Sequence, residues 1–509
     1  MEVDNEDSKK LISNDQLDGY LPLIALVERV FQSYKSLSLS FTYKNDEAST
    51  SSSSSGTPIT QMSSTMPSLP FNIDFNSIRR TYSLLFGIAN DTVIEELEKV
   101  IDLSVYALCV SIRMLIKKAD FSNEHELDQI VHALLIVNEL PLLEEPKYMD
   151  RCSKIFYATV SELPVSAQCK IIRMWSKWHI DELKIFLNKL QQYITVCVIS
   201  KNMDDENSRN QDEDEDEPEN ERNCLHKNEG VSGAVGCLRL IYYASVLGGR
   251  LDSEEQIKKE RDVEAEEVVY FQNLFAQEEP NIFSDSTNSL NSKLDPLEEQ
   301  LNFRIIDCRE PRIPNDQFIN EVANKYIDIQ HDYVEYIQQV QNLDTRSHYG
   351  NRAPKKNIFS FLSNPFFLTL SKKNLGLYYD NKIKMMRERR NNIMMSLLEG
   401  SVPNPYFKMR LSRNSLLSET LCLIELQEQE NPAILRKQLF IEFENEQGID
   451  QGGVSKEFFQ LVIDELLNKG YSKDFKLNLL LPEHLTIFLV NFILNWIPFN
   501  VLNQSVLFY

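Results

Sequence analysis

The segment from Leu439 to Lys469 constrains local structure more tightly than any other part of the chain. It opens with an alternation in which Leu439, Ile441 and Phe443 are separated by Phe440 and Glu442. A two-residue period is typical of a β-strand with one buried face. Residues 445–448 then favour a turn, so we predict that the strand ends there.

A pair of glycines separates this strand from an amphipathic helix. Two adjacent glycines can adopt positive φ without steric cost, and we expect a close backbone approach at this point. The serine after them is predicted to cap the helix, and two phenylalanines open its apolar face. The resulting strand–turn–helix unit is structural, and nothing in it resembles a poised nucleophile, base or metal ligand. Its characteristic residues are Asp450, Gly452, Gly453, Ser455, Phe458 and Phe459.

Most of the remaining chain favours helices. Its 509 residues contain only 15 glycines, too few for the many turns that an all-β fold needs. Hydrophobic residues make up 42% of the chain, enough for more than one core, and the length allows roughly three domains of about 150 residues. We therefore predict a mainly α fold: a helical N-terminal region followed by the first strand–turn–helix of an incomplete α+β lobe.

Changes in composition suggest the domain boundaries. Serine-rich, acidic and Ser/Asn-rich stretches cannot build a packed core, so they are predicted to be linkers. The predicted order is a helical segment at 1–47, a Ser-rich linker at 48–70, a helical domain at 71–200, an acidic linker at 201–228, a helix at 229–250, a charged and Ser/Asn-rich linker at 251–292, a helical domain at 293–430, the strand–turn–helix unit at 431–470 and an apolar tail at 471–509.

Two helices show the clearest one-sided patterns. The first begins near Asp181, a predicted N-cap, and follows the pair Trp175 and Trp178, which we expect to pack in the core. The second runs through residues 379–397, ends at Gly400 and carries a cluster of basic side chains. Two interpretations of the cluster stay open: a solvated surface, or a contact with an acidic partner such as the chain's own acidic linker.

The charge balance excludes one class of partner. The net charge is −23, and nucleic-acid binding requires a basic footprint, so no nucleic acid is expected as a partner. Residues 203–221 contain eleven acidic side chains and one basic side chain, a run that favours a solvated linker.

The cysteines indicate a reducing compartment rather than a metal site. No two of the eight form a C-x-x-C pair, so neither a bound metal nor a cofactor is expected. The first ten residues lack the apolar segment of a secretory signal, which suggests a cytoplasmic or nuclear protein. Residues 485–509 are uncharged, but the dense apolar part is shorter than a membrane-spanning helix. Membrane attachment is therefore not expected.

The segment GIDQGGVSKEFFQLV closely resembles the opening of the HECT domain of HECT-type ubiquitin-protein ligases. Residues 171–200, 237–252, 295–320 and 359–390 resemble the helical region of one subfamily, the Angelman-type or papillomavirus oncoprotein-associated ligases. The resemblance covers residues 20–470 apart from the linkers. It implies that the strand–turn–helix belongs to the larger N-terminal lobe of an α+β HECT domain. It also implies partners: a ubiquitin-conjugating enzyme, ubiquitin and protein substrates.

Two departures from the subfamily shape the expected function. The cysteine-rich zinc module that opens those ligases has no counterpart before Leu21, and no cysteine follows Cys422. The family transfers ubiquitin through a thioester on a C-terminal cysteine, which needs a positioned thiolate. We therefore expect this chain to be inactive alone and to lack the surface that recruits the conjugating enzyme. Two alternatives stay open: a non-catalytic substrate- or partner-binding helical protein, and an incomplete gene model of a full-length ligase.

One short segment suggests a docking site. Where the subfamily has an acidic LxxLL helix, this chain has Phe271, Leu274 and Phe275, which share one helical face. That spacing suits insertion of a helix into a groove, and it equally suits a helix that packs on its own domain.

Overall fold

The computed structural model describes residues 19–42, 73–118, 124–209, 225–251, 295–348, 359–400, 406–430, 434, 437–446, 450 and 452–467. The chain divides into two compact units. The first, called here the helical unit, comprises residues 1–328 and 338–368. The second, called here the mixed unit, comprises residues 329–337 and 369–509.

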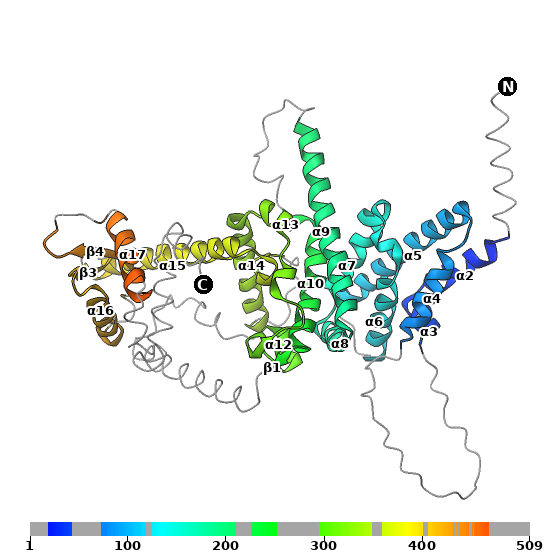
Figure 1. The fold of residues 1–509 in the computed structure, drawn as a ribbon, viewed down its shortest axis with the longest axis horizontal. Coiled ribbons are helices and arrows are strands. Elements are labelled where there is room, and N and C mark those ends of the chain that lie inside the picture. Colours follow the sequence, from blue (N-terminus) through cyan, green and yellow to red (C-terminus); the bar gives the residue numbers. More distant parts are fainter. Residues whose placement is uncertain are drawn as a thin grey trace, which may run out of the picture. The chain divides into compact units, whose positions relative to one another are not determined.

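The described part of the helical unit is almost entirely helical (Figure 1). Its α-helices are α2 (Leu21–Phe31), α3 (Tyr34–Ser40), α4 (Phe75–Leu85), α5 (Asp91–Lys118), α6 (Glu124–Asn138), α7 (Lys154–Ser161), α8 (Val165–Trp175), α9 (Ile180–Arg209), α10 (Glu229–Leu247), α12 (Pro296–Leu301) and α13 (Glu321–Tyr326). Short helical turns are η1 (Pro141–Glu144), η2 (Pro146–Tyr148), η3 (Met149–Ser153), η4 (Leu225–Lys227), η6 (Ile305–Asp307), η7 (Asn315–Phe318) and η8 (Pro365–Phe367). Strands β1 (Arg250–Leu251) and β2 (Cys308–Glu310) pair antiparallel.

Helix α10 forms the centre of the helical unit. Thirteen of its 19 residues are buried, and it packs against α7, α8 and α9. It is long and apolar enough to cross a membrane by length and composition alone, a test that buried core helices also pass. In this fold 72% of that apolar stretch is buried. Asn228 caps the helix, because its side-chain oxygen accepts hydrogen bonds from the amides of Gly230 and Val231.

Glycines allow α10 and α7 to pack backbone against backbone. A Cβ atom added at Gly233 would lie 2.6 Å from the amide nitrogen and 2.8 Å from the Cα of Ala158. One turn along, a Cβ at Gly236 would lie 2.4 Å from the Cβ of Ser161. Such separations are shorter than any normal carbon contact, so α10 carries glycine here because no larger residue fits without moving α7.

An ion pair lies at the edge of this core. Asp102 of α5 is fully buried, and its carboxylate pairs with the guanidinium of Arg151, whose side chain is half exposed. A buried carboxylate is stable in its charged form only when a partner compensates it. Arg151 therefore determines whether Asp102 can remain in the core.

Residues 295–313 are attached to the earlier helices by specific polar contacts. Asp295 accepts hydrogen bonds from Arg239 and, at 2.9 Å, from the hydroxyl of Tyr243. Arg312 donates to the backbone carbonyls of Ser176 at 2.7 Å and Trp178 at 2.6 Å. Those two carbonyls lie just beyond the end of α8, where helical carbonyls lack internal partners. The contacts join segments that lie between 52 and 136 residues apart in sequence into one unit.

The mixed unit begins with the first residues of α14 (Ile329–His348) and continues with α15 (Leu370–Glu399). The hydroxyl of Tyr333 donates to Asp380 at 2.8 Å, which joins α14 to the first half of α15. As predicted, the helix through residues 379–397 ends at Gly400, whose φ of +67° is the left-handed value that favours glycine.

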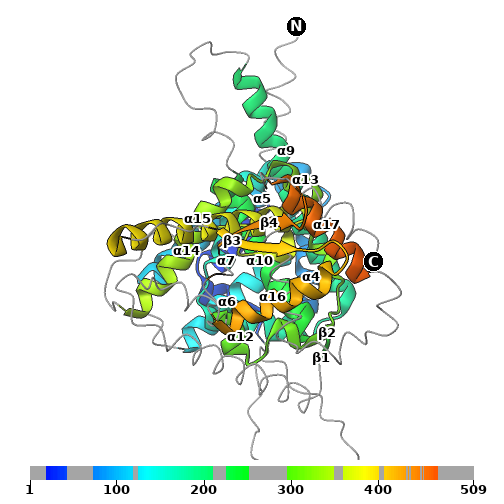
Figure 2. The same ribbon diagram turned by 90° about the vertical axis from the view of Figure 1, so that its left-hand side faces the viewer.

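A parallel two-stranded sheet follows. Strand β3 (Tyr406–Leu411) pairs in parallel with β4 (Gln438–Phe443), from Tyr406 opposite Gln438 to Leu411 opposite Phe443. Helix α16 (Leu416–Glu430) connects them, and α17 (Gly453–Leu467) follows β4. Figure 2 shows β3 and β4 side by side with α16 and α17 beside them. The crossover helix is required because parallel strands cannot be joined by a tight turn.

The structure confirms the mainly α fold class and differs from the sequence expectations at several points. Residues 406–411 lie in a range predicted to be helical, yet they form β3, because alternate side chains face the sheet's core. Helix α9 continues to Arg209, into the predicted acidic linker. It also begins at Ile180, so Asp181 lies inside its first turn rather than at the cap. Trp175 is buried as predicted, whereas Trp178 is half-buried and packs edge-on against Phe75.

Candidate functional site

The candidate site is the β4–turn–α17 unit, and Asp450 holds it together. One carboxylate oxygen accepts a hydrogen bond from the amide of Ile441 in β4 at 3.0 Å. The other accepts from the amides of Gly452 at 2.9 Å and Ser455 at 3.2 Å, and from the Ser455 hydroxyl at 3.3 Å. A single carboxylate therefore links the strand to the first turn of the helix, whose free amides favour a negative charge.

This geometry corrects the predicted cap. Helix α17 begins at Gly453, so Ser455 is its third residue and donates to Asp450 instead of capping the helix. Of the two glycines only Gly452 adopts positive φ, at +97°. A Cβ added at either glycine would meet no atom within 4 Å, so the expected close backbone approach is not found among the described residues. Gly452 serves the turn's conformation.

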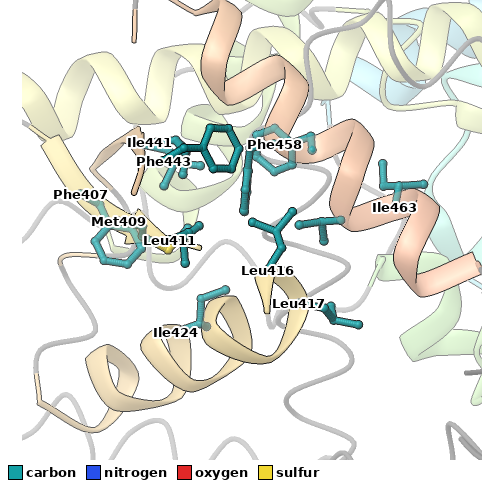
Figure 3. Close-up of a cluster of buried hydrophobic side chains, with 13 residues drawn as sticks. Phe407, Met409, Leu411, Leu416, Leu417, Ile424, Ile441, Phe443, Phe458 and Ile463 are labelled. Carbon is teal, nitrogen blue, oxygen red and sulfur yellow. The ribbon is translucent and has the colours of Figure 1, made fainter. Parts of the chain in front are cut away.

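The two phenylalanines of α17 enter the core of the mixed unit. Phe458 and Phe459 are fully buried, with ring centroids 5.2 Å apart. Figure 3 shows Phe458 and Ile463 of α17 directed towards side chains of both strands and of α16. The cluster comprises Phe407, Met409, Leu411, Leu416, Leu417, Ile424, Leu439, Ile441, Phe443, Phe458, Phe459, Val462 and Ile463.

Arg413, which no sequence pattern identifies, connects three parts of this unit. It follows β3, forms ion pairs with Glu446 after β4 and, at 2.8 Å, with Glu457 in α17, and stacks 4.0 Å above the Phe443 ring. The hydrogen bond from Arg413 lowers the pKa of Glu446. Only the spatial neighbourhood identifies this residue, because its partners are 33 and 44 positions away.

Seven cysteines lie in the described part of the chain, and their surroundings differ. Cys109, Cys152, Cys169 and Cys237 are buried, Cys197 and Cys308 are intermediate, and Cys422 on α16 is exposed. Burial raises the pKa of Cys109 and of Cys152 to about 12, which keeps both as thiols. Burial likewise raises the pKa values of Cys169, Cys197 and Cys237.

The remaining predicted positions do not form a site in the described part of the chain. Phe271, Leu274 and Phe275, the predicted docking face, lie outside the described residues, as does the apolar tail. Within the described ranges, no group of three or more His, Cys, Asp or Glu side chains is placed to hold a metal ion. The β4–turn–α17 unit thus brings Asp450, Gly452, Gly453, Ser455, Phe458 and Phe459 together as a structural assembly.

Comparison with known proteins places the chain near one class of enzyme. No family model matches it. It is 26% identical over 149 residues to the probable E3 ubiquitin-protein ligase HECTD2 of Homo sapiens, covering 29% of this chain and 18% of that protein. It is 28% identical over 162 residues to the probable E3 ligase HUL4 of Eremothecium gossypii (31% and 19%), and 33% identical over 123 residues to the probable E3 ligase mug30 of Schizosaccharomyces pombe (24% and 14%).

Over these residues the chain is similar to probable E3 ubiquitin-protein ligases, HECTD2 among them. The matched region spans about a fifth of the length of each of the first relatives.

Proposed function

We propose that this chain supplies the substrate- or partner-binding helical region of a HECT-type ubiquitin ligase together with the opening of its catalytic N-terminal lobe. The observation that carries this proposal is the β4–turn–α17 unit. Asp450 lies in the segment GIDQGGVSKEFFQLV, whose sequence resembles the HECT family, and its carboxylate bonds to Ile441 and Ser455. The partial similarity to several E3 ligases supports the same assignment.

The Angelman-type subfamily is the finer assignment that we propose. Its support comes from the resemblance of residues 171–200, 237–252, 295–320 and 359–390 to that subfamily's helical region. The first three segments lie in the helical unit, where α10 packs against α8 and α9, and α12 packs against α8. Ubiquitin, a conjugating enzyme and protein substrates are the partners that follow from the proposal.

We further propose that this polypeptide does not form a ubiquitin thioester by itself. Thioester transfer needs an accessible thiolate beside the surface that holds the incoming donor. Four of the described thiols are buried, and Cys422 lies on α16, ahead of the strand–turn–helix unit. A protein of this kind would act by binding, and in the presence of a complete ligase it would compete for substrates or partners.

A thioester assay tests the proposal. The 509-residue chain is incubated with ubiquitin, activating enzyme, conjugating enzyme and ATP, and the products are separated with and without reducing agent. We expect no reducible ubiquitin adduct on the wild-type chain. A reducible adduct that disappears in Cys422→Ser would overturn the proposal of inactivity. Capture of the same substrates by this chain and by a complete ligase would support the binding role.

A further inference from the structure

The outer side of β3 carries backbone groups that β4 does not bind. In a parallel pair, successive residues of a strand direct their N–H and C=O groups alternately towards the partner strand and away from it. The carbonyl of Leu411 accepts from the amide of Glu444 at 2.9 Å, so Leu411 faces β4, as does Met409 two residues before it. The N–H and C=O groups of Lys408 and Arg410 therefore point away from β4. These two residues are called here the β3 edge.

Neighbouring outward positions of the sheet are closed, whereas the β3 edge is open. Next along β3, the amide of Ser412 donates to the carboxylate of Glu419 at 2.7 Å. On the opposite side of the sheet, the outward amide of Ile441 donates to Asp450 at 3.0 Å. Within the described ranges, no group bonds the outward N–H and C=O groups of the β3 edge. Open donors and acceptors on a strand are the groups to which an added strand binds.

The side chains of the β3 edge are basic. Lys408 and Arg410 are exposed, on the face of the sheet opposite the apolar core. The ammonium of Lys408 lies 5.2 Å from the centre of the Phe440 ring, which is a weak contact at an exposed site. Glu442 of β4, opposite Arg410, is the acidic residue that the two strands place on this face. Strand β3 itself thus carries two positive charges and no negative charge.

We propose that the β3 edge binds an extended acidic segment of a partner protein, which adds a third strand to the sheet. The backbone of this segment bonds the open N–H and C=O groups, and acidic side chains at alternate positions lie opposite Lys408 and Arg410. A second copy of this chain is disfavoured as the occupant, because pairing of two β3 edges brings like charges together. The site lies in the mixed unit, so it is separate from the partner binding proposed for the helical region and can fail independently of it.

A designed peptide tests the proposal on the full 509-residue chain. The probe is a rhodamine-labelled Thr-Val-Glu-Val-Asp-Val-Thr peptide, and its binding is measured by fluorescence anisotropy. A peptide with lysine in place of both acidic residues should bind at least about tenfold more weakly, because like charges then meet at the edge. A peptide N-methylated at its three central amides keeps its charges but loses the donors that strand pairing needs. It should also bind at least about tenfold more weakly.

Charge reversal in the protein locates the binding. Lys408→Glu with Arg410→Glu should weaken binding of the acidic peptide at least about tenfold, because the edge then repels it. The matched control is Arg389→Glu with Arg390→Glu in α15, which changes the net charge equally at exposed positions and should leave binding unchanged. The comparison of peptides uses the wild-type chain, so it tests the proposal even if a variant unfolds.

Four results would overturn the proposal. The first is no measurable binding of the acidic peptide to the full chain, and the second is equal binding of the acidic and lysine peptides. The third is binding that N-methylation leaves unchanged, which indicates charge attraction without strand pairing. The fourth is loss of binding in the α15 control but not in the edge variant, which places the acidic ligand on α15.

Discussion

The helical unit and the mixed unit bury their cores in different ways. In the helical unit, α10 alone buries thirteen residues and has helices on several sides. In the mixed unit, thirteen apolar side chains from two strands and two helices form the core. A two-stranded sheet has little stability of its own, so each core contact there supports a larger share of the fold. Equal perturbations should thus have local effects in one unit and unit-wide effects in the other.

Removing one buried ring from each unit is the strongest test of this difference. Phe156→Ala in α7 and Phe458→Ala in α17 both empty a fully buried site, and each should cost about 3–5 kcal/mol. Hydrogen exchange should show loss of protection throughout β3, β4, α16 and α17 in Phe458→Ala. In Phe156→Ala, α10 should stay protected. Loss of hydrogen-exchange protection over equally large parts of both units would refute the comparison.

The next largest difference is expected between the ion pairs of Arg151 in the helical unit and those of Arg413 in the mixed unit. Arg151→Ala leaves the fully buried Asp102 carboxylate without its partner, which should cost about 3 kcal/mol. Arg413→Ala breaks pairs with two exposed glutamates, and solvent replaces most of that interaction, so its effect on the mixed unit should be much smaller. Urea unfolding followed by unit-specific hydrogen exchange measures both. The double variant Arg151→Met with Asp102→Leu should regain most of the loss.

Glycine substitutions test the packing of α10 on α7. Alanine usually stabilises a helix by about 1 kcal/mol relative to glycine. At Gly233 its Cβ would meet the Ala158 backbone at 2.6 Å, and we expect a net loss of about 1–3 kcal/mol in the helical unit. Gly453→Ala is the matched control, because a Cβ there meets nothing within 4 Å. Thermal unfolding should show a lower midpoint temperature for Gly233→Ala and no decrease in that temperature for Gly453→Ala.

The smallest predicted effect concerns pH. Partial burial lowers the pKa of His132 in α6 below its usual 6.5, so the unfolded chain binds a proton more readily than the folded one. Stability of the helical unit should therefore decrease as the pH falls below about 6.5. The depressed pKa of Glu446 makes the mixed unit lose stability only below about 4.5.

Unfolding at pH 7 and 5.5 checks this order. His132→Gln should reduce the difference between the two pH values in the helical unit, whereas His179→Gln, at an exposed position, should leave it unchanged. A larger decrease in the stability of the mixed unit between pH 7 and 5.5 would contradict the assignment of the effect to His132.

Local patterns predicted local structure well and long-range pairing poorly. The alternation from Leu439 to Phe443 identified β4, and the glycines identified the turn before α17. The same alternation in Tyr406–Leu411 does not by itself predict a strand, because six residues between helical stretches carry little signal until β4 is placed beside them. The bonds of Asp450 and Arg413 depend on that pairing, which explains why Ser455 was predicted as the cap and Arg413 was missed.

The parallel pairing of β3 with β4 has a consequence for synthesis of the chain. Leu411 ends β3 and Gln438 begins β4, so β3 emerges from the ribosome well before its partner exists. At about 5–20 residues per second, the intervening stretch takes about one to five seconds to translate. During that interval, the alternating apolar side chains of β3 are open to chaperones and to neighbouring nascent chains, whereas α7 and α8 can already assemble behind them.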